Sequence, residues 1–103
     1  MIMLSDMATK DCIPMLKALA DETRWSIVRE LLASTYTVGQ LVDRLGVSQY
    51  NVSKHIRVLR EAGIIESQRD GKHVRCSVAS EFRKRAGRGS NILDLGCCTF
   101  RFE

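Results

Sequence analysis

Apolar residues in the first third of the chain recur every three to four positions, which is the spacing of an amphipathic helix. Residues 10–19 form the first such segment, and Pro14 is tolerated there only near the first turn. Asp21 is a candidate N-cap for a second segment, because its carboxylate can accept hydrogen bonds from the free amides of the next turn. We therefore expect two helices, the second ending near Ala33.

Two further helices are expected after a polar break, joined to each other by a tight turn. Thr37 can cap a short third helix, which Gly46 ends. Ser48 can cap a fourth helix, whose apolar residues keep a four-then-three spacing until Gly63 closes it. Two helices joined by a short turn with a glycine are typical of a helix-turn-helix, in which the second helix enters the major groove of DNA.

The hydrophobic period changes after Gly63. Residues 64–68 and 73–78 are short extended runs, and the Asp70-Gly71 pair between them is a strong hairpin signal. Residues 80–90 fit a frayed helix or a loop, and residues 91–102 alternate in a way that fits a strand.

The predicted fold class is therefore α+β and mainly helical. It is a winged helix-turn-helix with four helices, a β-hairpin wing, and a C-terminal segment that is either a strand or a short helix. Phe100 and Phe102 in that last segment are expected to bury against the wing or a second subunit.

One core is enough for a chain of 103 residues that is 45% hydrophobic. We expect residues 1–9 to be a flexible N-terminus and residues 10–78 to form the DNA-binding domain. Residues 79–103 would be a C-terminal extension used for dimerisation or sensing. A small core leaves apolar stretches at its ends, which are candidates for contact with a second copy.

The fourth predicted helix has a face suited to DNA. Successive residues lie about 100° apart, which puts the apolar residues on one side and a polar, cationic set on the other, with no acidic residue before Glu61. Gln and Arg pair with base edges, Ser and Tyr donate to phosphates or bases, and Lys neutralises phosphate. A basic wing supplies a second contact. The predicted DNA-binding residues are Ser48, Gln49, Tyr50, Ser53, Lys54, Arg57 and Arg60 on the helix and Arg69, Lys72, His73 and Arg75 on the wing.

Charge supports a polyanionic partner, since the formal net charge is +4 and the sequence pI is about 9.1. The alternative is a winged-helix protein-interaction module, which would expose apolar anchors on the fourth helix instead. We find no Gly-rich phosphate loop, nucleophile elbow or clustered acid–base set, so no enzymatic activity is expected. The sequence shows neither a signal peptide nor a membrane-spanning apolar run, so we expect a cytoplasmic protein without a membrane partner.

Several motifs over about residues 12–78 resemble the ArsR/SmtB family of winged helix-turn-helix transcriptional repressors. The motifs are Leu19-Ala20-Asp21-Glu22-Thr23-Arg24, Val47-Ser48-Gln49, Leu59-Arg60-Glu61-Ala62-Gly63-Ile64-Ile65 and the Arg69-Asp70-Gly71-Lys72 turn. The resemblance implies a homodimer that occupies an inverted-repeat operator in double-stranded DNA and is released when an inducer alters the dimer. It also implies that the helix matching residues 48–62 reads the DNA.

The chain departs from the family at the usual sensor sites. Arsenic-sensing members carry paired cysteines at the start of the helix matching residues 38–45, where this chain has Thr37, Val38, Gly39 and Gln40. Zinc-sensing members use Asp, His and Glu on a long final helix, but residues 79–90 contain no His. We expect neither site, and the first helix and residues 91–102 can make the dimer in place of a long final helix.

The cysteines are the remaining sensor candidates. They are expected to be reduced, because the sequence shows no export signal. Cys97 and Cys98, with Cys76 or Cys12 as a third ligand, could bind a soft inducer such as trivalent arsenic, antimony or another thiophilic metal, and no cofactor is otherwise required. Adjacent strand residues point to opposite faces, so both sulfurs reach one ion only if Gly96 bends the backbone or subunits exchange the segment. Reversible oxidation and a purely structural role are the alternatives.

Overall fold

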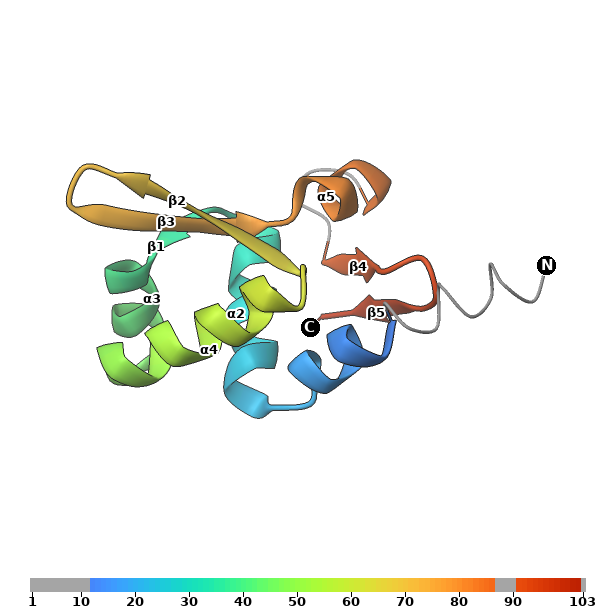
Figure 1. Cartoon of the computed structure of the whole chain (residues 1–103), viewed down its shortest axis with the longest axis horizontal. Coiled ribbons are helices and arrows are strands. Elements are labelled where there is room, and N and C mark those ends of the chain that lie inside the picture. The colour runs from blue at the N-terminus through green and yellow to red at the C-terminus, as the bar shows by residue number, and fades with distance from the viewer. Residues whose placement is uncertain (1–11, 87–90, 103) are drawn as a thin grey trace.

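The computed structural model describes residues 12–86 and 91–102. The helices are a first helix covering residues 12–19, α2 (Glu22–Ala33), α3 (Val38–Leu45), α4 (Gln49–Glu61) and α5 (Ser80–Ala86). The strands are β1 (Tyr36–Thr37), β2 (Ile65–Asp70), β3 (His73–Val78), β4 (Ile92–Asp94) and β5 (Thr99–Arg101) (Figure 1). This order confirms the predicted winged helix-turn-helix, whereas the predicted flexible segment, residues 1–9, lies outside the described residues.

Each of the three predicted N-caps is confirmed by a hydrogen bond within its own turn. The Asp21 carboxylate accepts from the Arg24 amide at 3.0 Å, and the Ser48 hydroxyl accepts from the Asn51 amide at 3.2 Å. The Thr37 hydroxyl accepts from the Gln40 amide at 3.1 Å, while the Gln40 side chain accepts from the Thr37 amide at 2.9 Å. This reciprocal pair satisfies two amides that the helix itself leaves free.

The wing is the long hairpin of a three-stranded antiparallel sheet with the order β1-β3-β2. Asp70 pairs with His73 across the turn at Gly71 and Lys72, so β2 extends through two residues that we had expected in the turn. The short strand β1 was not predicted, because two residues have no measurable period; it places Tyr36 opposite Cys76.

The C-terminal segment forms a hairpin and not one strand. Ile92 pairs with Arg101 and Asp94 pairs with Thr99, and Gly96 between them adopts a left-handed φ of 91°. Before it, α5 agrees with the helical alternative for residues 80–90 as far as Ala86, and residues 87–90 lie outside the described residues.

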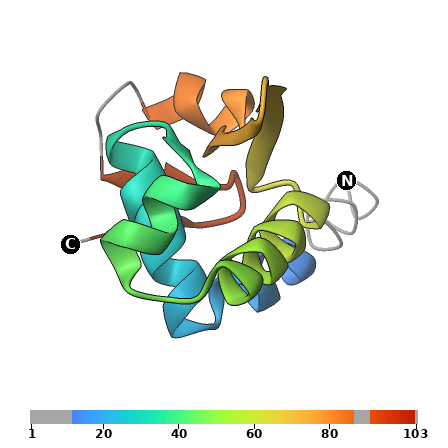
Figure 2. The ribbon, with the colours of Figure 1, turned by 90° about the vertical axis from the view of Figure 1, so that its left-hand side faces the viewer.

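The hairpin is fixed to the helices by aromatic contacts on Trp25 of α2. The ring of Phe102 stacks on Trp25 with centroids 3.9 Å apart, and Phe100 meets Trp25 edge-on at 5.9 Å. Phe102 is therefore buried against α2 and not against the wing. Phe100 is half-buried, and its burial against a second subunit stays a prediction. Seen from the end that carries the wing tip, α4 and the wing lie on the same side of the molecule (Figure 2).

None of the helices in the described ranges has the length and apolar character that crossing a membrane requires.

Candidate functional site

The fourth helix, α4, turns a buried apolar side to the core and a polar side to solvent. Val52, Ile56 and Leu59 are buried. All of the α4 residues predicted to contact DNA are exposed, and Tyr50 is exposed over 76% of its surface. The start of the helix is fixed by Ser48, which accepts from the amide of Asn51, and the preceding turn at Gly46 uses a φ of 67°. The exposed face is thus held rigidly by the core beneath it.

Two arginines of this face already have partners. Arg57 donates to the Glu61 carboxylate at 3.1 Å, one helical turn further on. Arg60 donates to the Ser67 hydroxyl of β2 at 3.2 Å. To contact a base, Arg57 must break its ion pair with the exposed Glu61 carboxylate or share it. Arg60 links the end of α4 to the wing.

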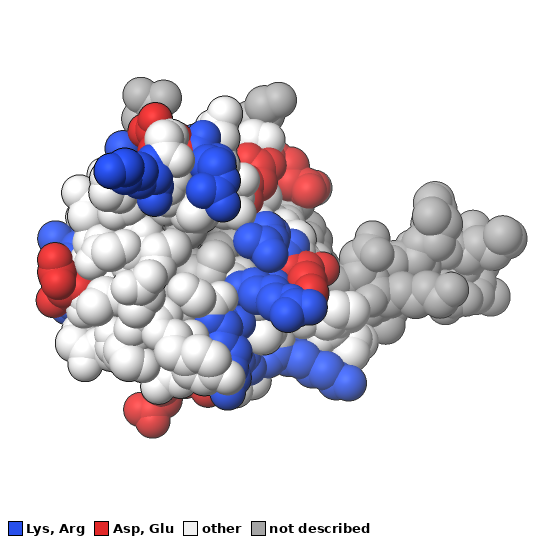
Figure 3. Space-filling view, turned by 60° about the vertical axis from the view of Figure 1, so that its left-hand side comes forward, with Lys and Arg blue, Asp and Glu red and all other residues white. Residues whose placement is uncertain are grey.

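The wing carries the second basic group. Arg69, Lys72, His73 and Arg75 are all exposed, and Arg75 lies 3.7 Å from the Asp70 carboxylate. Figure 3 shows Lys and Arg side chains both in its upper part, towards the wing, and across its middle and lower part, with uncharged side chains between them. The arrangement offers two separated cationic contacts on one face, which suits a duplex backbone that passes both.

A polar network that the sequence analysis missed holds α4 against the start of α2. Arg24 donates through Nε to the Ala18 carbonyl at 2.6 Å, and its terminal nitrogen lies 3.1 Å from Nδ1 of His55. The other ring nitrogen of His55 is 4.0 Å from the Asp21 carboxylate. The Arg24 amide, with the charges of Arg24 and His55, lowers the pKa of Asp21 despite the opposing effect of burial. The close spacing of Asp21 and Arg24 was visible in the sequence, but their approach to His55 depends on tertiary packing.

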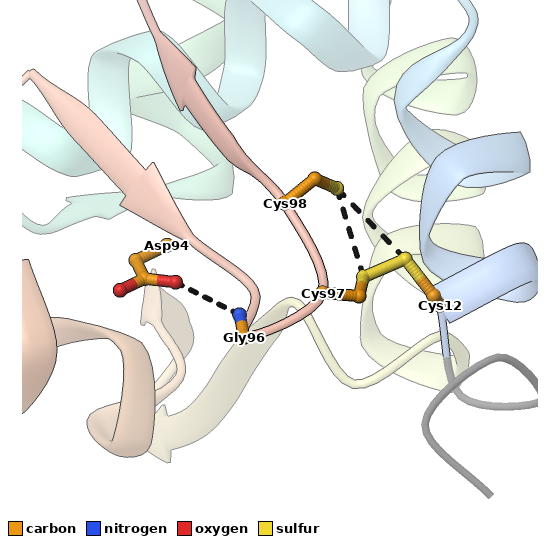
Figure 4. Close-up of a disulfide and its surroundings, with 5 residues drawn as sticks. All are labelled: Cys12, Asp94, Gly96, Cys97 and Cys98. Carbon is orange, nitrogen blue, oxygen red and sulfur yellow. Dashed lines mark hydrogen bonds between the residues drawn. A yellow bond between two sulfur atoms is a disulfide. The ribbon is translucent and has the colours of Figure 1, made fainter. Parts of the chain in front are cut away.

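Three cysteine sulfurs meet between the first helix and the β4–β5 hairpin. Cys12 and Cys97 form a disulfide, and the Cys98 sulfur lies 3.8 Å from that of Cys12 and 3.6 Å from that of Cys97 (Figure 4). The expectation of reduced thiols is therefore wrong for Cys12 and Cys97, because folding joins positions 85 residues apart. The backbone bend expected at Gly96 is present, and it lets the two neighbouring sulfurs face the same point.

Cys76, one of the expected ligands, lies elsewhere. Its side chain is completely buried in β3, and this burial raises the pKa of its thiol. It is not a member of the cluster of Cys12, Cys97 and Cys98, whose sulfurs all lie within 4.8 Å of one another. Of the two alternatives for a third ligand, the structure therefore places Cys12, and not Cys76, beside the pair.

A cavity of about 600 Å³ connects this cysteine cluster with the end of α4. Cys97 lines it together with Met15 of the first helix, Phe82 of α5, and Glu61 and Gly63 at the C-terminal end of α4. The cysteine cluster thus lies close to one end of the helix whose exposed face carries the predicted DNA contacts.

Comparison with known proteins identifies the group to which these features are similar. Residues 21–67 match the model of the family described as bacterial regulatory protein, arsR family. The probable mercury resistance operon repressor of Streptomyces lividans is 34% identical over 89 residues, which cover 81% of this chain and 71% of that protein. The transcriptional regulator CmtR of Mycobacterium tuberculosis is 39% identical over 70 residues, which cover 68% of this chain but only 59% of CmtR.

A solved structure supports the fold. The homodimeric winged helix-turn-helix DNA-binding domain of Mb0332 from Mycobacterium bovis superposes with a TM-score of 0.72 at 22% sequence identity. The superposition covers 79% of this chain and 75% of the Mb0332 fragment.

Proposed function

This chain belongs to the ArsR family of bacterial regulatory proteins, and from that premise we propose that it is a dimeric repressor that binds an operator in double-stranded DNA. The members of this family are transcriptional regulators, so the chain is not an enzyme. Residues 10–78 would form the DNA-binding domain, and residues 79–103 would serve dimerisation or sensing. The protein would act in the cytoplasm, where the operator is.

The observation that carries this proposal is the exposed face of α4. Seven residues able to contact phosphates or base edges, Ser48 to Arg60, lie in solvent on a helix whose opposite side is buried. A module that binds proteins would be expected to expose apolar anchors there, and Tyr50 is the only large apolar or aromatic side chain of the described residues that α4 exposes. Arg69, Lys72, His73 and Arg75 on the wing would contact the backbone or the minor groove.

Dimerisation is supported by the first helix, where Ile13 and Leu16 are exposed over 45% and 36% of their surface. The relative with the same fold, Mb0332, is described as homodimeric. A two-fold symmetric dimer presents two copies of α4, so the operator would be an inverted repeat.

The inducer would act at the cysteines. The cysteine cluster could take up a soft ion, and the disulfide between Cys12 and Cys97 supports reversible oxidation as the alternative. That the Streptomyces relative is described as a mercury resistance operon repressor supports the first of these.

Selection of bound duplexes from a random pool, at fixed salt and with reductant, tests the DNA-binding proposal. We expect an inverted repeat to be recovered. Ser53→Ala and Arg57→Ala should each weaken binding to it by about 1–3 kcal/mol if the side chain contacts a base edge. Each variant removes a side chain that is exposed in the free protein, so folding should be unaffected.

Arg101→Ala is the matched control for charge. Arg101 is exposed on β5, which lies in the half of the molecule away from the wing tip (Figure 1), so its loss should change operator affinity little. Recovery of no common sequence, or unchanged affinity in both α4 variants, would contradict the proposed DNA-reading face.

A further inference from the structure

The cavity of about 600 Å³ at the end of α4 has a size within the range of roughly 300–1,000 Å³ that is typical of small-molecule sites. Its walls come from the first helix, α4, α5 and the β4–β5 hairpin. We propose that it binds a small organic cation, an amine with an apolar body, and that this ligand strengthens operator binding through Arg57. The site is independent of the repressor function proposed above, and its effect on DNA rests on that function.

The buried part of the cavity lining is apolar. Met15 of the first helix, Phe82 of α5 and Leu95 of the hairpin are exposed over only 7%, 4% and 5% of their surface. All three belong to the hydrophobic core, which holds them in place. An apolar wall of this kind favours a ligand with a hydrocarbon body, because binding removes the apolar surface of that body from water.

The exposed part of the lining is acidic. Glu61 at the end of α4 and Glu81 in the first turn of α5 both line the cavity, and both are exposed. No Lys or Arg is among the described residues that line it, although the whole chain has a formal net charge of +4. The two carboxylates therefore favour a positively charged ligand here, whereas the basic surface elsewhere favours anions.

Two uncharged features of the lining also favour a cation. The C-terminal end of a helix carries a partial negative charge, and α4 ends at this cavity with Glu61, Ala62 and Gly63. The aromatic ring of Phe82 can add a cation–π contact. An ammonium group near the carboxylates, with its hydrocarbon body against the apolar wall, would use all of these features.

The carboxylate of Glu61 connects the cavity to the DNA-reading face. It accepts from Nε of Arg57 at 3.1 Å, in an ion pair between two exposed side chains one helical turn apart. An ammonium group at Glu61 competes with Arg57 for this carboxylate and so makes Arg57 available to DNA. An exposed ion pair at this spacing is weak, so the gain in operator affinity should be about twofold. Linkage requires that DNA strengthen binding of the amine by the same factor.

Titration of the full chain with benzylammonium chloride at neutral pH, followed by NMR of the backbone amides, tests the site. The largest shifts should occur at Glu61, Gly63, Glu81 and Leu95. Glu61→Gln and Glu81→Gln should each weaken binding of the amine about two- to fivefold. Glu22→Gln makes the same change on an exposed residue of α2 outside the cavity lining, and it should leave binding unchanged.

Two uncharged or anionic analogues control for the apolar body of the ligand. Benzyl alcohol and benzoate keep the aromatic ring and lack the positive charge. Both should bind at least about fourfold more weakly than benzylammonium, because neither gains the attraction to the two carboxylates. The amide spectrum of each glutamine variant also shows whether that variant is folded.

Operator affinity with and without the amine tests the connection to DNA, and sodium chloride at the same ionic strength controls for screening. Benzylammonium should raise the operator affinity of the unaltered chain about twofold. Glu61→Gln should show this higher affinity without the amine and should not respond to it, because Arg57 has already lost its partner. Glu81→Gln should bind the operator as the unaltered chain does, and it should need more amine for the same response.

Equal binding of benzylammonium and benzyl alcohol, or unchanged amine affinity in both glutamine variants, would overturn the site. An amine that binds in the cavity without raising operator affinity would overturn the connection through Arg57. A chain that binds the amine in this way but no operator would instead refute the repressor function and leave the site standing.

Discussion

Asp21 serves two elements at once at the scale of a single residue. Its carboxylate caps α2 through the amide of Arg24 and also lies 4.0 Å from the ring of His55 on α4. The pKa of Asp21 is lowered first by the amide of Arg24 and then by the charges of Arg24 and His55. The ionised carboxylate is therefore the form that the folded chain prefers.

Replacement of Asp21 separates the cap from the charge. Asp21→Ala should lower the free energy of unfolding by about 1 kcal/mol through loss of the cap, and Asp21→Asn, which keeps a capping oxygen, should lower it less. A folded pKa below the ordinary value of about 3.9 contributes stability that is fully present above that value and is lost as the pH falls through the folded pKa. The stability advantage of the unaltered chain over Asp21→Asn should therefore shrink in acid.

Urea unfolding at neutral pH and at several values below about pH 5 measures both effects. The difference in unfolding free energy between the unaltered chain and Asp21→Asn should shrink in that acid range, where the Asp21 carboxylate becomes protonated. A difference between the unaltered chain and Asp21→Asn that stays constant into acid would show that the charge contributes nothing. Equal stability of Asp21→Ala and the unaltered chain would show that the cap does not contribute to the free energy of unfolding.

At the scale of the element, α3 has one glycine within it and one at its C-cap, and replacement of the two by alanine should change stability in opposite directions. Gly46 ends the helix at a φ of 67°, where a side chain is strained, so Gly46→Ala should destabilise the chain by about 1 kcal/mol. Gly39 lies within α3, and an added methyl group would meet only the Thr37 hydroxyl, at 3.9 Å. Gly39→Ala should stabilise by about 0.5 kcal/mol and is the matched control.

The midpoints of urea unfolding for these two variants decide the matter, because both change one helix by one methyl group. A Gly46→Ala chain as stable as the unaltered one would show that the turn into α4 tolerates another conformation. The helix-turn-helix would then be less rigidly set than the proposed DNA contact requires.

The caps and the buried face of α4 were predictable from sequence because they depend on neighbours within one turn. Thr37 finds its partner at Gln40, and the spacing of Val52, Ile56 and Leu59 by itself marks the buried side. The pair of Arg57 and Glu61 also lies one turn apart, so its spacing was visible in the sequence. Local order of this kind is written in consecutive residues.

The C-terminal hairpin could not be predicted in the same way. The alternation of residues 91–102 is identical for one long strand and for two short strands that fold back at Gly96. Contact with Trp25, far away in the sequence, favours the second. The choice of Cys12 over Cys76 in the cysteine cluster has the same origin, since both depend on which distant elements pack together.

At the scale of the whole molecule, the proposed DNA contacts and the cysteines lie at different ends. The wing tip and the start of α4 occupy one side of Figure 1, and the β4–β5 hairpin occupies the other. The helix α4 runs from the wing side towards that hairpin (Figure 1), and the network of Asp21, Arg24 and His55 ties it to the start of α2. A change at the cysteines would therefore reach the DNA through the position of α4 as a unit.

The end of the molecule that carries the cysteine cluster also carries the surface that we assign to the dimer. Ile13 and Leu16 on the first helix are exposed, while Cys12 and Met15 on its other face are buried. Exposure of the apolar side chains of Ile13 and Leu16 to water is unfavourable, and a second copy of the chain would cover them. Leu16→Glu should remove about 1.5–3 kcal/mol of apolar burial from that interface.

The expected result is a rise of roughly ten- to 100-fold in the dimer dissociation constant, measured by sedimentation equilibrium. Lys17→Gln makes the same change in net charge on the exposed neighbouring residue and should leave the dimer unchanged. Operator affinity at low protein concentration should fall in Leu16→Glu alone, because a monomer contacts one half of an inverted repeat. If Leu16→Glu dimerises as tightly as the unaltered chain, the first helix is not the interface, and the dimer must be built from other surfaces.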